Sequence, residues 1–282
     1  MTKKITVVVI IVVVIIGIFT NNKVFSLGKD NKNELSIKEK LKILGNINKK
    51  ISYFKDDYID RYIEYKTKNK KLSNSRIVLE VNMGLDKDFY TNIYPSPNQN
   101  THFILVNKYY YLEKNYKPDK LEKIDSKYSF GEKYLANVAR ISFECLAKKA
   151  KEEGLTIRAV STYRSYDYQS NLYNNYVKED GVSNADKYSA RPGFSEHQTG
   201  LAVDVDNGVS GYNNFENTKE FTWMMENAHK YGFILRYPKD KEYITGYIYE
   251  AWHYRYVGVE VATFIHKNNL TYEEYYFKYI DK

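Results

Sequence analysis

An apolar run that carries acidic side chains constrains the fold of this chain more than any other feature. Residues 201–206 read LAVDVD. As a β-strand, this run places its leucine and valines on one face and both aspartates on the other. A carboxylate on the inner face of an otherwise apolar strand is costly unless a partner compensates its charge. Asp204 therefore requires a nearby partner.

The candidate partner is His197, seven residues before Asp204. Gly200 lies between them, and its missing side chain lets the backbone turn closely. An imidazole and a carboxylate at such a turn–strand junction can supply two ligands for zinc. These residues alone are equally compatible with a hydrogen-bonded His–Asp pair that has a structural role.

A second group of polar residues occurs in YEAWHYRYVG, residues 249–258. In a regular strand Glu250 and His253 face opposite ways, so both can act together only if Glu250 lies in a turn or bulge that opens the strand. A glutamate three residues before a ligand histidine can deprotonate water without occupying a coordination position. Alone, this spacing also fits a solvated glutamate beside a core histidine. With His197 and Asp204, it gives a ligand set that leaves a fourth zinc position open.

The order of several motifs makes the resemblance to a known family specific. The motifs are STYRSYDYQSNLYNNY, RPGFSEHQTGLAVDV, YGFILRYP and YEAWHYRYVG. Together they resemble the zinc D,D- and L,D-carboxypeptidases of bacterial cell walls, the VanY-type and LdcB-type enzymes of the LAS group. The earlier stretches VNMGLDKDFYTNI and ILVNKYYYLEKNYKPDKL resemble the region that leads into this family's catalytic core. The resemblance covers residues 56–282.

This resemblance implies a role for each matching residue. One zinc ion per chain is expected, and its ligands fall on His197, Asp204 and His253. The general base falls on Glu250, and the arginine that binds the substrate carboxylate or the oxyanion falls on Arg164. Substrate contacts are expected from Gln169, Ser195, Tyr237 and Trp252. One departure is Ala251, where the family usually has proline.

The implied activity is that of a zinc D-alanyl-D-alanine carboxypeptidase acting on peptidoglycan stem peptides. Two alternatives share the metal site: an L,D-carboxypeptidase acting on tetrapeptide stems, and a wall endopeptidase. A wall-binding module that lost catalysis is disfavoured, because such a module needs neither Glu250 nor an open metal position.

Helices and strands are interspersed along the chain, which predicts an α+β fold. Helices are expected at about 130–152, 167–178 and 217–230, and two more at the C-terminus. Strands are expected at 155–161, 201–206, 232–237 and 247–257. The resemblance implies a LAS-type zinc peptidase domain, with a small, mainly antiparallel sheet flanked by helices.

Two details of these helices can be checked against the structure. The first helix is expected to bury a face formed by Leu135, Val138, Ile141, Cys145 and Leu146. Cys145 is the chain's one cysteine, so no internal disulfide is possible, and a small buried hydrophobe is its expected role. The second helix is expected to take Asp167 as its N-cap.

The N-terminus carries an export signal. Lys3 and Lys4 precede an apolar run from Ile5 to Phe19, and no small-x-small cleavage site follows. We therefore expect an uncleaved membrane anchor at 1–20, with the rest of the chain at the extracytoplasmic face; cleavage would instead release the chain to the cell wall. Residues 21–55 are expected to form a tether and helical stalk, and 56–282 the zinc carboxypeptidase domain.

The net charge of +8 suits a membrane surface or an acidic wall polymer. No basic cluster with interleaved aromatics resembles a nucleic-acid-binding motif, so nucleic acid is not expected as a partner. The chain has 30 tyrosines. An AT-rich genome, whose codons favour tyrosine, is the simpler interpretation; the alternative, aromatic walls that line a binding groove, needs only a few of them.

Overall fold

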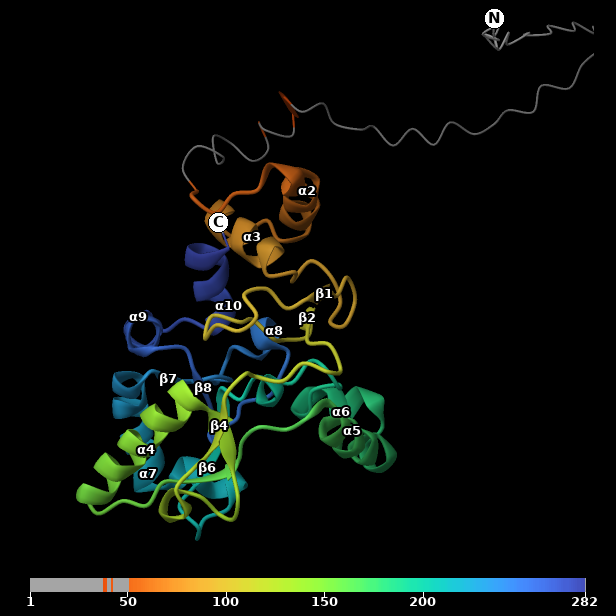
Figure 1. Cartoon of the computed structure of the whole chain (residues 1–282). Helices are drawn as coiled ribbons and strands as arrows, with labels where there is room; N and C mark the ends of the chain where they lie inside the picture. Colours follow the sequence, from red (N-terminus) through yellow and green to blue (C-terminus); the bar gives the residue numbers. More distant parts are fainter. Residues whose placement is uncertain (1–37, 40–41, 43–50, 282) are drawn as a thin grey trace, which may run out of the picture. The chain divides into compact units, whose positions relative to one another are not determined.

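The fold is centred on a four-stranded antiparallel sheet in the order β5–β6–β8–β7. Figure 1 labels β6, β7 and β8 of this sheet. The structure is a computed structural model that describes residues 38–39, 42 and 51–281. The strands are β5 (Arg158–Ser161), β6 (Ala202–Asp206), β7 (Phe233–Leu235) and β8 (His253–Tyr256). Two small sheets flank it, and helices alternate with strands along the chain. The predicted α+β class and mainly antiparallel sheet are confirmed.

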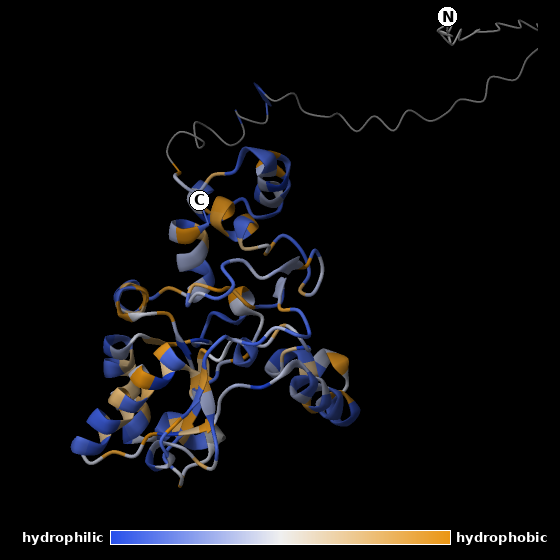
Figure 2. Cartoon of the chain, viewed as in Figure 1, coloured by the Kyte–Doolittle hydropathy of each residue, from blue (hydrophilic) through white to orange (hydrophobic). Residues whose placement is uncertain are grey.

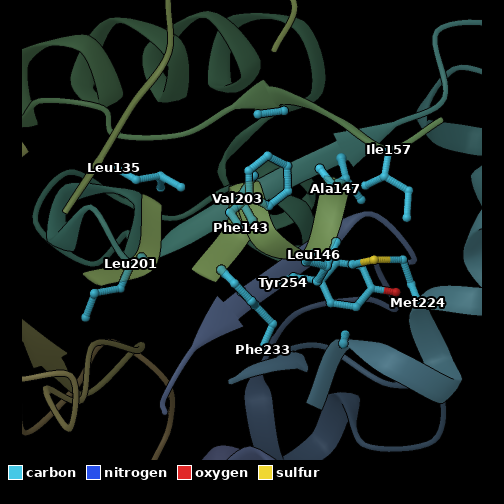
Figure 3. Close-up of a cluster of buried hydrophobic side chains, with 14 of the residues drawn as sticks. Leu135, Phe143, Leu146, Ala147, Ile157, Leu201, Val203, Met224, Phe233 and Tyr254 are labelled. Carbon is cyan, nitrogen blue, oxygen red and sulfur yellow. The ribbon is translucent and has the colours of Figure 1, made fainter. Parts of the chain in front are cut away.

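One face of this sheet packs against α4 (Asn137–Glu152) and α7 (Lys219–Asn227). Figure 3 shows side chains from these helices and from the sheet gathered in one cluster. Val203 and Val205 of β6 belong to this cluster, as the predicted alternation requires. The aspartates of β6 project to the opposite face, which remains available for the site.

The buried face predicted for α4 is wrong at three of its five positions, whereas Leu135 and Leu146 are buried as predicted. Val138 and Ile141 are 51% and 48% exposed, and Cys145 is exposed as well. The helix instead buries four small or aromatic side chains and one leucine: Ala139, Phe143, Leu146, Ala147 and Ala150. Figure 2 shows hydrophobic and hydrophilic residues alternating along α4. Both faces carry apolar residues, so periodicity alone did not identify the one that meets the sheet.

The start of this helix is also later than predicted. Residues 134–136 form β4 (Tyr134–Ala136), which pairs with β3 (Leu121–Lys123) as an antiparallel ladder. Leu135 lies opposite Glu122 in that ladder. The backbone N–H of Tyr134 also donates to Thr162 Oγ1 at 3.1 Å. These pairings hold the segment extended until Asn137.

Two helices follow β5: α5 (Tyr166–Asp180) and α6 (Val182–Tyr188). The N-cap of α5 is Ser165, whose Oγ accepts from the backbone N–H of Tyr168 at 3.2 Å. The prediction of Asp167 as the cap is therefore wrong by two residues. Asp167 lies in the first turn, where a carboxylate suits the helix dipole.

The N-terminal part of the described chain contains η2 (Asp56–Tyr58), α2 (Ile59–Lys68) and α3 (Asn74–Asn82). Residues 51–55 form a turn and extended chain, not the last part of a helical stalk. Ile51, Tyr53 and Phe54 pack against the buried residues of α2 and α3. Their apolar spacing therefore reflects packing against the domain.

The C-terminal part contains α9 (Val259–Asn268), α10 (Tyr272–Tyr275) and a π-helical turn, η7 (Tyr276–Ile280), which confirms the two expected helices. It contacts the N-terminal part directly. Arg76 Nη1 of α3 lies 2.5 Å from Glu274 Oε1, and Lys55 Nζ lies 2.7 Å from Asp281 Oδ2. Figure 1 shows α3 beside the C-terminal end.

Short elements complete the described chain. They are β1 (Tyr94–Pro95), β2 (Tyr110–Tyr111), η3 (Ser126–Tyr128), η4 (Glu196–Thr199), η5 (Tyr212–Asn217), η6 (Ala228–Tyr231) and α8 (Glu242–Thr245). β1 and β2 pair in parallel.

The described residues all belong to one compact unit. The predicted anchor and most of the predicted tether and stalk lie outside the described residues. Within the described part of the chain, no helix is long and apolar enough to cross a membrane.

Candidate active site

Sheet register brings two of the predicted ligands together. Asp204, in the middle of β6, lies opposite Ser161 of β5 on one side and opposite His253 of β8 on the other. Directly opposed residues in an antiparallel pair project to the same face. Asp204 Oδ1 is accordingly 2.9 Å from His253 Nδ1, and both side chains are buried.

His197 reaches the same place from η4, the turn that precedes β6. Its Nδ1 is 2.7 Å from the carbonyl oxygen of Thr162, and its Nε2 is 3.3 Å from Asp204 Oδ2. A carbonyl accepts, so Nδ1 carries the proton and Nε2 is left as a lone-pair donor. Gly200 closes the turn at φ +69°, where a Cβ would lie 2.9 Å from Leu121 Cδ2. The expected need for glycine is confirmed.

These three side chains can hold a metal ion. One ligand atom from each of His197, Asp204 and His253 lies within 4.8 Å of the others. Two imidazoles and one carboxylate suit zinc and leave a fourth position open. The donor chemistry of the site therefore fits the predicted cofactor.

The site keeps the Asp204 carboxylate ionised. Burial would raise the pKa of Asp204, but His197 and His253 outweigh it and hold that pKa well below its usual range. Burial and the Arg164 guanidinium lower the pKa of His197 to about 4. Burial would also lower the pKa of His253, but the Asp204 and Glu196 carboxylates outweigh it and raise that pKa to about 9. The carboxylate thus remains ionised between the two rings.

Glu250 lies beside this centre without joining the ligand group. Its Oε2 is 3.8 Å from His253 Nδ1, and burial raises the pKa of its carboxyl to about 8. It precedes a turn at Ala251–Trp252 that leads into β8, and its backbone N–H donates to Tyr237 O at 3.1 Å. The expected position of Glu250, in a turn that opens the strand, is confirmed. The turn forms with Ala251 in the place of proline.

Arg164 is held over the site by three hydrogen bonds. Its Nη2 donates to Asp204 Oδ2 at 2.9 Å, its Nε to Ser161 Oγ at 2.9 Å, and its Nη1 to Gln169 Oε1 at 3.2 Å. A guanidinium has five N–H groups, so two are left for a ligand. Gln169 also donates through Nε2 to Ala190 O at 2.8 Å. Its amide therefore orients Arg164, whereas the sequence predicted a substrate contact.

All the predicted site residues line one groove, which has a volume of about 800 Å³. Ser195, Tyr237 and Trp252 line it, as do the proposed ligands, Glu250, Arg164 and Gln169. The ring of Tyr237 also packs against that of His253, tilted by 35°, with ring centroids 4.9 Å apart. Seven of the chain's tyrosines contribute to the wall: Tyr134, Tyr163, Tyr168, Tyr176, Tyr188, Tyr237 and Tyr247.

Sequence reasoning missed a buried ionic network behind the site. Glu196 accepts from Arg236 Nε at 2.8 Å and from Arg255 Nη1 at 2.7 Å, and Arg236 also pairs with Glu273 at 2.6 Å. Burial would raise the pKa of Glu196, but the two arginines outweigh it and hold that pKa far below its usual value. One signal was available: Arg255 shares a strand face with His253, so a buried face there requires a carboxylate.

Comparisons with known proteins agree with the predicted family. Residues 132–259 match the VanY family, described as D-alanyl-D-alanine carboxypeptidase. The chain is 42% identical over 225 residues to the putative carboxypeptidase YodJ of Bacillus subtilis (strain 168), covering 76% of this chain and 82% of YodJ. It is 36% identical over 179 residues to the bifunctional D-Ala-D-Ala dipeptidase and D-Ala-D-Ala carboxypeptidase VanXYC of Enterococcus gallinarum, covering 61% of this chain and 92% of VanXYC.

Solved structures give the same result. The LdcB LD-carboxypeptidase matches with a TM-score of 0.63 and 43% identity, over 67% of this chain and 91% of LdcB. VanYB in complex with D-alanine-D-alanine matches with a TM-score of 0.55 and 33% identity, over 62% of this chain and 96% of VanYB. A mutant VanY D,D-pentapeptidase in complex with Zn(II) matches with the same TM-score of 0.55, over 62% of this chain and 98% of that protein.

These comparisons, together with the candidate His/Asp/His centre, identify the chain as a metallopeptidase. The chain belongs to the VanY family of zinc D,D- and L,D-carboxypeptidases. The predicted family is confirmed.

Proposed function

We propose that this chain is a zinc-dependent D-alanyl-D-alanine carboxypeptidase that removes the terminal D-alanine from peptidoglycan stem peptides. The observation that carries the proposal is the position of Glu250. Its buried carboxyl lies 3.8 Å from the His253 nitrogen that faces Asp204, at the edge of the candidate metal centre and in the wall of the groove. A carboxyl with a raised pKa beside an open metal position is what proton transfer to and from a scissile peptide requires.

In this proposal one zinc ion is held by His197 Nε2, the Asp204 carboxylate and His253 Nδ1. These are the atoms that approach one another most closely between the three side chains, at 3.3 Å and 2.9 Å. When bound, zinc would polarise the scissile carbonyl and lower the pKa of water. A cation held there would also lower the pKa of Glu250 and favour its basic form.

Different residues of the chain then carry out the separate steps of the reaction. Glu250 takes a proton from the water that attacks the carbonyl carbon of the last peptide bond. Arg164 stabilises the negative charge that develops on the carbonyl oxygen or binds the terminal carboxylate of the substrate. Glu250 returns the proton to the nitrogen of the departing D-alanine as the C–N bond breaks.

The groove wall supplies the contacts that hold the substrate. We assign Ser195, Tyr237 and Trp252 to these contacts because each lines the groove beside the candidate metal centre. Gln169 acts indirectly, by orienting Arg164, because its side-chain amide is hydrogen-bonded to Arg164 and to the carbonyl of Ala190.

The relatives support this substrate class. VanXYC is named for D-Ala-D-Ala dipeptidase and carboxypeptidase activities, and VanYB was solved with D-alanine-D-alanine. A second candidate is L,D-carboxypeptidase activity on tetrapeptide stems. It is favoured by the LdcB LD-carboxypeptidase, which matches at 43% identity and a TM-score of 0.63.

Hydrolysis of defined muropeptides tests both candidates. The zinc-loaded full-length chain is incubated with stems ending in D-Ala-D-Ala and in L-Lys-D-Ala, and the released D-alanine is measured. Faster release from D-Ala-D-Ala supports the primary proposal. Faster release from L-Lys-D-Ala selects the second, and release from neither stem overturns both. Glu250→Gln serves as the inactive control.

We also propose that residues 5–19 anchor the protein in the membrane, with the catalytic domain at the extracytoplasmic face. The support is the apolar run that follows Lys3 and Lys4. In its native host the mature protein should pellet with membranes and retain Met1 or Thr2. A mature N-terminus beyond residue 20 would mean that the segment is removed and the protein released to the wall.

A further inference from the structure

Glu196 has one carboxylate oxygen bound and one that faces the metal centre. Its Oε1 accepts from both Arg236 Nε, at 2.8 Å, and Arg255 Nη1, at 2.7 Å. Its Oε2 lies 3.6 Å from His253 Nε2. The side chain is 0% exposed, so no solvent reaches the second oxygen.

Both facing atoms are otherwise unsatisfied. Glu196 Oε2 and His253 Nε2 are buried and have no hydrogen-bond partner among the residues that the structure describes. A buried polar atom without a partner is destabilising. A movement of a few tenths of an ångström would turn the pair into a hydrogen bond and satisfy both atoms at once.

The other ring nitrogen of His253 determines which proton is available for that bond. Nδ1 faces Asp204 Oδ1 at 2.9 Å and Glu250 Oε2 at 3.8 Å, so it lies on the side of the candidate metal centre. A neutral imidazole has one N–H. When Nδ1 donates its lone pair to a metal, the proton must be on Nε2, which points at Glu196.

We propose that Glu196 is a positioning residue of the metal centre, whose Oε2 accepts the Nε2–H of His253 and fixes the tautomer that presents Nδ1 as a ligand. The inference rests on the proposed zinc site. The two histidines then present opposite nitrogens, each set by a different partner. The Thr162 carbonyl sets His197, and Glu196 sets His253. Such outer partners orient a ligand ring and raise its basicity.

The same network offers a matched control. Glu273 is as buried as Glu196, and it binds Arg236 through both carboxylate oxygens, at 2.9 Å and 2.6 Å. Its remaining contact is with Asn107 Nδ2, at 3.2 Å. Glu273→Gln therefore removes a buried charge from Arg236 without removing the group that faces His253.

The first test uses the unmodified chain. The full-length protein is labelled with ¹⁵N-histidine and loaded with zinc, and long-range ¹H–¹⁵N correlation assigns the ring nitrogens of His253. We expect a protonated Nε2 and a metal-bound Nδ1. A metal-bound Nε2 would overturn the role of Glu196 while leaving the zinc enzyme intact. A wild-type chain that takes up no zinc would instead overturn the proposed function.

The second test measures zinc affinity by competition with a chromophoric chelator. Glu196→Gln should raise the Kd for zinc by about 10–100-fold. If the glutamine side-chain oxygen keeps its hydrogen bonds with Arg236 and Arg255, its NH₂ group faces the Nε2–H of His253. Two hydrogen-bond donors then face each other. Glu273→Gln should keep a Kd near that of wild type, even though its thermal stability falls. Equal Kd values for the two variants would overturn the inference. Should Glu196→Gln fail to fold, the assignment of the His253 ring nitrogens in the wild-type chain tests the inference instead.

Discussion

Asp204 and His253 lie directly opposite each other on neighbouring antiparallel strands, and their Oδ1 and Nδ1 atoms are 2.9 Å apart. The geometry of the candidate metal centre is thus partly a property of sheet register. A slip of one residue between β6 and β8 would turn one of these side chains to the other face. The cluster of apolar side chains beneath the sheet holds that register, since the same strands contribute Val203 and Tyr254 to it.

Metal content should separate the ligands from the base. We expect His197→Ala, Asp204→Ala and His253→Ala each to lower zinc occupancy substantially, as measured by elemental analysis of the purified chain. Glu250→Gln should keep its zinc and lose about 10²–10⁴-fold in kcat, because proton transfer is lost while the ligands remain.

Asp206→Asn is the control for this experiment. Asp206 lies on the same strand as Asp204 and is buried, but its Oδ1 accepts from the backbone N–H of Gly208 at 2.6 Å. This variant should keep its zinc. Full occupancy in all three ligand variants would remove the proposed site, and zinc loss in Glu250→Gln with normal turnover after reloading would remove the proposed base.

Arg164 should make hydrolysis depend on a free C-terminus. If its two remaining N–H groups bind the terminal carboxylate, amidating the substrate should lower wild-type kcat/KM by about 10- to 100-fold, equivalent to 1.5–3 kcal/mol for a charged hydrogen bond. The same amidation should matter far less in Arg164→Ala, because the contact is already lost.

Kinetic constants for both substrates, with zinc content measured in parallel, distinguish the alternatives. Parallel zinc measurement is needed because Arg164 also binds Asp204. An equal fall in kcat on free and amidated substrates would assign Arg164 to the oxyanion. Wild-type cleavage that is indifferent to amidation would indicate the endopeptidase alternative.

Glu274 should make stability depend on pH. Its carboxylate accepts from the Thr271 backbone N–H at 2.9 Å and pairs with Arg76. Burial opposes the charge, but these partners outweigh it and lower the pKa of Glu274 below its ordinary value of 4.5. A lowered carboxyl pKa contributes stability above the ordinary value, and this contribution is lost as pH falls through the folded-state value.

Glu274→Gln should therefore lower the free energy of unfolding by about 2–4 kcal/mol at pH 7, with the deficit shrinking as pH falls below about 4.5. Denaturant titrations between pH 7 and pH 3 measure this. Glu64→Gln is the control, because the exposed pair of Glu64 with Lys68 should contribute nothing measurable. A deficit that stays constant over this range would contradict the prediction.

The buried face of α4 can be tested by paired truncations. Phe143 is fully buried, whereas Ile141, on the same helix, is 48% exposed. Phe143→Ala should cost about 3–5 kcal/mol in the free energy of unfolding, because it leaves a cavity against the sheet. Ile141→Ala should stay within about 0.5 kcal/mol of wild type. If Ile141→Ala lowered the free energy of unfolding more than Phe143→Ala, the buried face predicted from periodicity would be correct.

Features that depend on a few consecutive residues were predicted correctly from the sequence. The alternation of Leu201–Asp206, the glycine turn at Gly200 and the position of Glu250 before β8 all follow from the geometry of a few consecutive residues. The ligand set itself came from the order of whole motifs, which carries more information than any single spacing.

The errors arose where the answer depends on distant partners. Ser165 and Asp167 are both good caps, and the turn after β5 decides between them. Glu196 is separated by 40 residues from Arg236 and by 59 from Arg255, so no local pattern pairs them. The buried face of α4 likewise depends on where the sheet lies.

The ion pair between Lys55 and Asp281 brings the two ends of the 51–281 segment together. A short peptide linker could therefore join these ends in a circular permutant. New ends could be opened at Gly181, between α5 and α6, where an added Cβ meets no atom within 4 Å. That cut leaves all four strands of the main sheet whole. Residues 51–281 could then be displayed from the junction of α5 and α6, without the segment that precedes residue 51.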